Sequence, residues 1–75
     1  MRYFFHIRHD RHEPDLVGAD LPDHHAAWRE ATKTAGAILQ DLDGRLRPGH
    51  DWQMEVADES RRVLFRLMIS AQQMD

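Results

Sequence analysis

The alternation of apolar and polar residues along the chain predicts three β-strands. Residues 2–8 and 62–69 carry apolar side chains on both alternating sets, whereas residues 51–57 alternate strictly between apolar and polar. Strict alternation is typical of a strand with one buried face, and two apolar sets are typical of a strand covered on both sides. The turn-forming residues of Asp58-Glu59-Ser60 separate the last two strands.

Between the first two of these strands, apolar residues recur at helical spacing. Asp23 follows Pro22 at the start of this segment, where a carboxylate stabilises the free amide groups of a helix. Polar residues occupy the opposite side of the segment, which predicts an amphipathic helix over about residues 23–42. Its apolar stripe comprises Ala27, Ala31, Ala35, Ile38 and Leu42.

The order of these segments predicts a two-layer α+β fold, with one helix packed on a three-stranded antiparallel sheet in β-α-β-β order. The short turn makes the last two strands antiparallel neighbours. Since residues 62–69 are the most apolar, we expect this strand in the centre of the sheet, with the first strand on its far side. We also consider a further short strand near residues 16–19 that pairs with the first strand and is ended by Gly18.

Length and composition limit the class of protein. The 75 residues predict a single small domain, residues 1–75, near the lower size limit for folding without disulfides, a structural metal or association. The absence of cysteine excludes disulfides, Fe–S clusters and thiolate zinc sites. No segment has the apolar run of a signal peptide or of a membrane span, so we expect a cytoplasmic, bacterial-type protein with no membrane partner.

The charge balance argues against nucleic acid as the main partner. The net charge is −3, from 13 acidic and 10 basic residues. Such a balance creates no general field that attracts phosphates. Two local basic clusters, 45–47 and 61–66, leave a nucleic-acid-binding accessory protein as an alternative.

Several segments together resemble a known family of short proteins from rhizobia and related proteobacteria. The most distinctive is the opening Arg2-Tyr3-Phe4-Phe5-His6, and further matching positions are Asp15, Gly18, Leu21-Pro22-Asp23, Ala27, Glu30-Ala31, Trp52, Val56 and Asp58-Glu59. The family is catalogued as a domain of unknown function, so the resemblance implies a fold order and no activity. This chain departs from the family's Asp-Glu-x-Gly turn, because Arg61 stands in place of the glycine.

Six histidines raise the question of a metal site. His6, His9 and His12 recur at intervals of three residues, and imidazole is a good ligand for zinc, nickel or copper. The spacing spans a strand and a proline-bearing loop, however, which separates the rings. Similarly, Asp58-Glu59 lacks the glycine-punctuated spacing of a calcium loop. We therefore predict no metal site and no cofactor.

His6 is the one residue that suggests catalysis. With Asp15 or Asp58 as an orienting partner it would be a general base, as in small histidine-dependent ribonucleases of the toxin–antitoxin type. A chain of 75 residues offers little room for a convergent acid–base pair in a pocket. We assign no catalytic residue and keep such a ribonuclease as an alternative.

The uncovered face of the sheet is the predicted functional surface. A single helix covers one face, and the other is expected to carry an apolar centre rimmed by charge, which is typical of an interface. The predicted function is therefore a non-catalytic interaction module, a homodimer or a partner of an unknown protein, joined by a sheet face or by an edge strand. The expected interface residues are Phe4, His6, Leu64, Arg66 and Met68.

Overall fold

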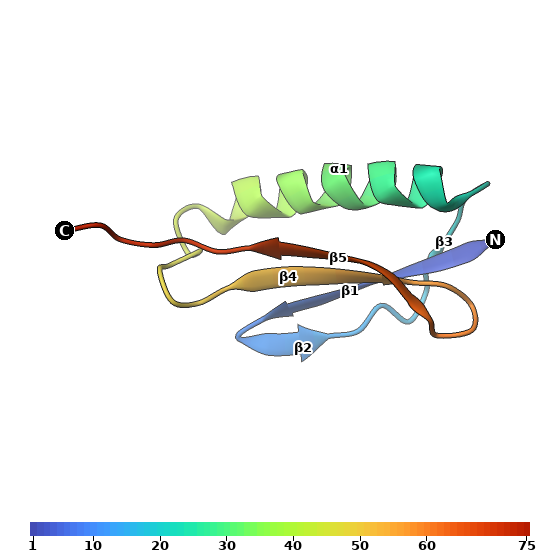
Figure 1. Ribbon diagram of the computed structural model, residues 1–75, viewed down its shortest axis with the longest axis horizontal. Helices are drawn as coiled ribbons and strands as arrows, with labels where there is room; N and C mark the ends of the chain where they lie inside the picture. The colour runs from blue at the N-terminus through green and yellow to red at the C-terminus, as the bar shows by residue number, and fades with distance from the viewer.

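The protein is described by a computed structural model of residues 1–75, which has one helix on one face of an antiparallel sheet (Figure 1). The elements in chain order are β1 (Arg2–His9), β2 (Arg11–Glu13), β3 (Ala19–Asp20), α1 (His24–Leu42), β4 (Trp52–Ala57) and β5 (Val63–Ile69). The five-stranded sheet runs in the order β2-β1-β4-β5, and β3 pairs with the other end of β1. The predicted α+β class and its β-α-β-β framework are confirmed.

The centre of this framework is β4, and the prediction that the last strand lies there is wrong. β4 pairs with β1 on one side and with β5 on the other, which leaves β5 at the edge. Trp52, Met54 and Val56 of β4 are at most 2% exposed, because the helix lies above them. Apolar residues on both faces of β5 suggested a central strand. They do not require one, since Met68, on the face away from the helix, is 60% exposed.

The segment between β1 and α1 contains two short strands. β2 folds back on β1 at Asp10, which adopts a left-handed conformation with φ of 69°. A short strand, β3, pairs with β1 as considered, but it lies at Ala19–Asp20. Leu16 and Val17, expected in that strand, lie in the loop, and Gly18 precedes the strand and does not end it. β2 escaped prediction because its three side chains are all exposed and therefore carry no apolar period.

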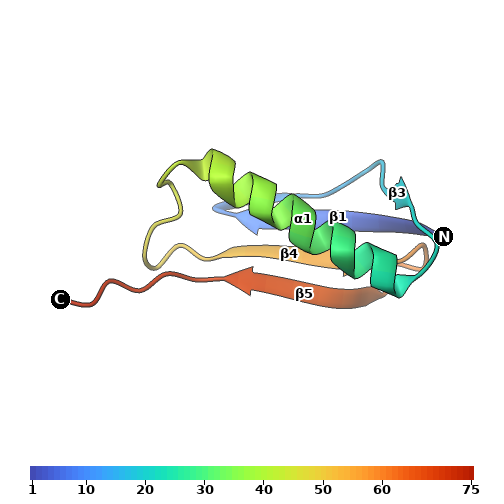
Figure 2. The same cartoon turned by 90° about the horizontal axis from the view of Figure 1, so that it is seen from above.

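Helix α1 begins and ends close to the predicted bounds. Asp23 is its N-cap, and one carboxylate oxygen accepts a 2.8 Å hydrogen bond from the amide of Ala26. The small buried side chains of Ala27, Ala31 and Ala35 form the stripe that faces the sheet. Figure 2 shows that the helix crosses the sheet diagonally, from β5 at its N-terminal end toward β1 at its C-terminal end. Helix α1 lacks the length and apolarity that a bilayer span needs.

An irregularity in β5 changes which side chains face outward. Phe65 is paired with Val56 but Val63 is paired with Ala57, so Leu64 is an extra residue in the ladder, a β-bulge. Leu64 packs against the core, whereas Val63 lies beside Ala57 in a hollow on the opposite face. The prediction that Leu64 lies on the uncovered face is therefore wrong, and the bulge is the physical reason.

Candidate functional site

The sheet face opposite α1, here called the outer face, is organised in three rows that cross the strands. One row is apolar, the middle row is charged and the third is mixed. From the strand pairing, the rows are Phe4–Ala57–Val63, His6–Glu55–Arg66 and Arg8–Gln53–Met68.

The charged middle row corrects the expectation of an apolar centre. Arg66 donates to the carboxylate of Glu55 through two nitrogens, at 2.8 and 2.6 Å. Met68 pairs with Gln53, four residues along β4 from Ala57, the partner of Phe4. At a rise of about 3.3 Å per residue this separation is about 13 Å. The predicted interface residues therefore do not form one apolar patch.

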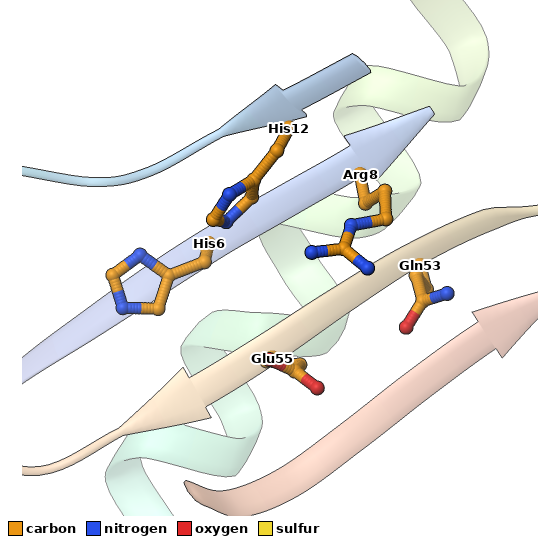
Figure 3. A pocket seen from close by; sticks show the side chains of 5 residues that line it. All are labelled: His6, Arg8, His12, Gln53 and Glu55. Carbon is orange, nitrogen blue, oxygen red and sulfur yellow. The ribbon is translucent and has the colours of Figure 1, made fainter. Parts of the chain in front are cut away.

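His6 is held by the backbone of the following loop. Its Nδ1 accepts a 3.0 Å hydrogen bond from the amide of Asp15, so in the neutral ring the proton lies on Nε2. The ring stacks on Phe4 at a centroid distance of 6.4 Å and meets His12 edge-on at 6.3 Å. The side chains of His6 and His12 lie together with Arg8, Gln53 and Glu55 (Figure 3).

The carboxylates proposed as orienting partners of His6 have other hydrogen bonds. The Asp15 carboxylate accepts from backbone amides, and only the main-chain nitrogen of Asp15 reaches His6. Asp58 lies in the β4–β5 turn and accepts from the amides of Ser60 and Arg62. The structure thus places Asp15 beside His6, but in a contact that fixes the ring and does not orient a general base.

Asp15 closes the outer edge of β1 between the two short strands. One carboxylate oxygen accepts from the amide of Phe5 at 3.1 Å, and the other accepts from Val17 and Gly18 at 3.0 Å each. β3 pairs with the start of β1 and β2 with its end. The carboxylate therefore takes the place of a neighbouring strand at Phe5, and the edge of β1 has a partner along its length.

Burial raises the pKa of Asp15, but the amide hydrogen bonds from Gly18, Phe5 and Val17 lower it by more. The net result is a pKa below the ordinary 3.8, because these donors favour the charged carboxylate. The carboxylate is thus ionised wherever the protein is folded near neutral pH.

Gly18 brings the same loop into close contact with β1. Its φ is +76°, and a Cβ added there would lie 2.8 Å from the carbonyl oxygen of Tyr3 and 2.9 Å from the Phe4 ring. Only glycine fits this conformation and this spacing. The neighbouring Leu16 and Val17 are 86% and 75% exposed, so the loop presents an apolar tip in a fixed position.

A hollow of about 640 Å³ lies between this loop and the apolar row of the outer face. Its walls combine apolar groups with charged groups of both signs. It is lined by Phe4, His6, Arg8, His12, Pro14, Asp15, Leu16, Glu55, Ala57, Asp58, Glu59, Arg61 and Val63. The hollow is the concave feature of the outer face and will be called the outer hollow.

The remaining histidines do not join His6 in a metal site. His9 pairs with Arg11 one position beyond the outer-face residue Arg8, so strand alternation directs its ring toward the other face, and its Nε2 is buried without a hydrogen-bond partner. His24 packs edge-on against Tyr3 at 5.8 Å on the helix side. No group of three or more His, Cys, Asp or Glu side chains is placed to hold a metal ion.

The two free edges of the sheet differ. At one edge, β2 is three residues long and its side chains, Arg11, His12 and Glu13, are all exposed. At the other, β5 is seven residues long, with β4 on one side and no strand on the other. Short, charged edges resist the addition of a further strand, whereas long apolar edges favour it.

Fold and site together define a small two-layer α+β domain with one helix on a five-stranded antiparallel sheet. The chain matches the sequence model of the family described as "Domain of unknown function (DUF6894)" over residues 2–70. The match covers most of the chain, so the protein belongs to this family, as its resemblance predicted. No curated protein and no solved structure matches it.

Sequence reasoning did not find several residues of these surfaces. The predicted interface does not include Arg8, Ala57 or Val63, although all three lie on the outer face. No turn was predicted at Asp15-x-x-Gly18. An Asp in a turn commonly accepts from the amides two and three residues later, as Asp15 does here. This tendency of Asp is the sequence signal that could have predicted a fixed loop.

Proposed function

We propose that the domain is a non-catalytic interaction module that forms a homodimer by pairing β5 with β5 of a second copy. The observation that carries this proposal is the contrast between the sheet edges, one closed by short charged β2 and the other left open along seven residues of β5. An open strand edge presents a row of unpaired amide and carbonyl groups, which a further strand satisfies.

The composition of β5 supports this use of the edge. Six of its seven residues are apolar, and none is proline or lysine, the residues that commonly protect an edge. Its one charge, Arg66, is held by Glu55 within the sheet. The guanidinium therefore does not need to be desolvated without a partner when another strand approaches.

One antiparallel register suits two copies of β5. With a two-fold axis at Leu67, that residue meets itself, Phe65 meets Ile69, and Arg66 meets Met68 of the second copy. An axis at Arg66 would instead place two guanidinium groups opposite each other, which is unfavourable. The Leu67 register is thus favoured over the Arg66 register, and its two-fold axis repeats each contact in both copies.

The proposal retains part of the predicted interface. Leu64, Arg66 and Met68 belong to β5, whereas Phe4 and His6 lie on β1, away from the edge. Pairing also adds burial to a small core, since only eight of 75 residues are buried in the single chain. A small domain gains stability from such association.

The first test is the mass in solution by light scattering at tens of micromolar. We expect twice the single-chain mass of 8.8 kDa. Met68 is 60% exposed, so a charge there is compatible with the fold. Met68→Lys faces Arg66 of the second copy and should give a monomer, whereas Met68→Glu should keep the dimer. Met74→Lys, in the tail at a residue that is 80% exposed, is the control.

Amide hydrogen exchange separates edge pairing from packing of the outer faces. In edge pairing, the β5 amides that point away from β4 gain protection as the protein concentration rises. Packing of outer faces leaves those amides exposed to exchange. A monomeric mass for the unmodified protein refutes the homodimer, and a dimer without the new protection refutes the edge.

A further inference from the structure

We propose that the outer hollow is a binding site for a small organic anion with an apolar body. This inference goes beyond the homodimer, because the hollow lies on the outer face over β1, β4 and the first residue of β5, whereas the proposed pairing uses the edge of β5. Its volume of about 640 Å³ lies within the usual range for small-molecule sites, about 300–1,000 Å³.

The floor of the hollow supplies the apolar contacts. It is formed by the row Phe4–Ala57–Val63, and Leu16 of the fixed loop stands at its side. Val63 is 45% exposed and Leu16 is 86% exposed. Covering these groups with an apolar ligand removes them from water, which favours binding.

The acidic side chains of the hollow all have intramolecular donors. Asp15 accepts from three backbone amides, and Asp58 accepts from two. Glu59 accepts from the amide of Arg2 at 2.7 Å, and Glu55 is paired with Arg66. These donors stabilise the charged carboxylates within the protein, and Glu55 is in addition neutralised by Arg66.

The basic side chains of the hollow are not used in this way. The guanidinium groups of Arg8 and Arg61 have no hydrogen-bond or ion-pair partner. Arg61 lies in the turn with Asp58 and Glu59, but Arg8 lies at the opposite end beside His6 and His12 (Figure 3). The two carboxylates beside Arg61 offset its charge, so the positive charge of the hollow is concentrated at the Arg8 end.

This charge arrangement selects the ligand class. A guanidinium binds a carboxylate or a phosphate with two parallel hydrogen bonds, and the neutral His6 ring has its Nε2–H free to donate. A niche of about 10 Å³ between His6, Arg8, His12, Gln53 and Glu55 has room for about one oxygen-sized group. The anion would lie at Arg8 and its apolar body over Phe4 and Val63.

The test is an NMR titration of the ¹⁵N-labelled protein with three probes of similar shape. These are 3-phenylpropionate, phenyl phosphate and the uncharged 3-phenylpropanamide. We expect the anions to shift the amide resonances around Arg8 and Val63 with a Kd of about 1 mM, which is usual for fragments of this size. The uncharged probe should bind about tenfold more weakly, and the tighter anion identifies carboxylate or phosphate as the preferred group.

Two variants test the assigned contacts. Arg8→Gln should weaken the anions about tenfold and leave the uncharged probe unchanged, while Arg47→Gln, an exposed arginine outside the hollow, should change neither. Equal binding of charged and uncharged probes, or no effect of Arg8→Gln, overturns the site. Because the readout does not depend on mass, a monomeric protein that binds the anions refutes the dimer and supports the hollow.

Discussion

The main-chain amide of Asp15 donates to Nδ1 of His6 across 3.0 Å, and the carboxylate of the same residue accepts from the amide of Phe5, the neighbour of His6. One residue of the loop therefore holds two consecutive residues of β1. Protonation of His6 would place a second N–H against the Asp15 amide and break the first of these contacts. The position of the His6 ring on the outer face depends on this loop.

Removal of the Asp15 carboxylate should destabilise the fold. It accepts three backbone hydrogen bonds, and Asp15→Ala leaves those donors without their charged acceptor. We expect a loss of about 2 kcal/mol in the free energy of unfolding, measured by urea denaturation. Asp20→Ala, which removes an exposed ion pair with Arg2, should cost less than about 1 kcal/mol. Equal losses in the two variants would contradict the role given to Asp15.

The lowered pKa of Asp15 makes stability dependent on acid. A carboxyl group whose folded pKa is below the ordinary 3.8 stabilises the fold above that value, and this contribution is lost as the pH falls through the folded pKa. Between about pH 6 and about pH 3, the unmodified protein should therefore lose more stability than Asp15→Asn. Parallel urea curves at both pH values measure the difference, and an identical loss would show that another group controls it.

Gly18→Ala should be more damaging than the same change at another left-handed glycine. The new methyl group would lie 2.8 Å from a backbone oxygen of β1, whereas Gly49 has a φ of +84° and nothing within 4 Å. Gly49→Ala thus measures the conformational cost alone, about 1 kcal/mol. We expect Gly18→Ala to exceed this by at least about 1 kcal/mol in urea denaturation. Equal losses in the two variants would mean that the loop can move away from β1 to make room for the methyl group without a loss of stability.

Arg61→Gly should stabilise the protein. Arg61 closes the β4–β5 turn with a φ of 65°, a conformation that costs a residue with a side chain about 1–2 kcal/mol. Glycine removes that cost but adds entropy to the unfolded chain, so we expect a gain of about 1 kcal/mol in thermal or urea unfolding. Arg62→Gly, at the first residue after the turn, is the control and should not stabilise.

Helix α1 and the three long strands were predictable because burial imposes a period on their residues. Trp52, Met54 and Val56 alternate because one side of β4 lies under the helix. The alanine stripe of α1 follows the same rule at helical spacing. Strand order was not accessible in this way, because an edge strand that exposes Met68 has the same apolar pattern as a central strand.

The parts of the candidate site that sequence reasoning missed depend on contacts between distant residues. Because of the bulge at Leu64, the side chains of Val63 and Leu64 lie on the faces opposite to those that simple alternation predicts. The sequence of residues 62–69 contains no signal for this bulge. Asp15 and Phe5 are ten residues apart, so their hydrogen bond follows only from the path of the loop. The lack of an ion-pair partner for Arg8 likewise follows only from the structure, in which the nearby carboxylates accept from other donors.

The closing of β1 by β2, β3 and Asp15 has a consequence for how assembly ends. A sheet with two open edges adds copy after copy and grows into a fibre, whereas a sheet with one open edge is used up by a single partner. In the proposed dimer, growth from β5 would therefore stop at a pair, because the segment from Arg11 to Asp20 covers the other side of β1. Loss of the Asp15 carboxylate would leave the amide of Phe5 without its acceptor, in the gap between β3 and β2.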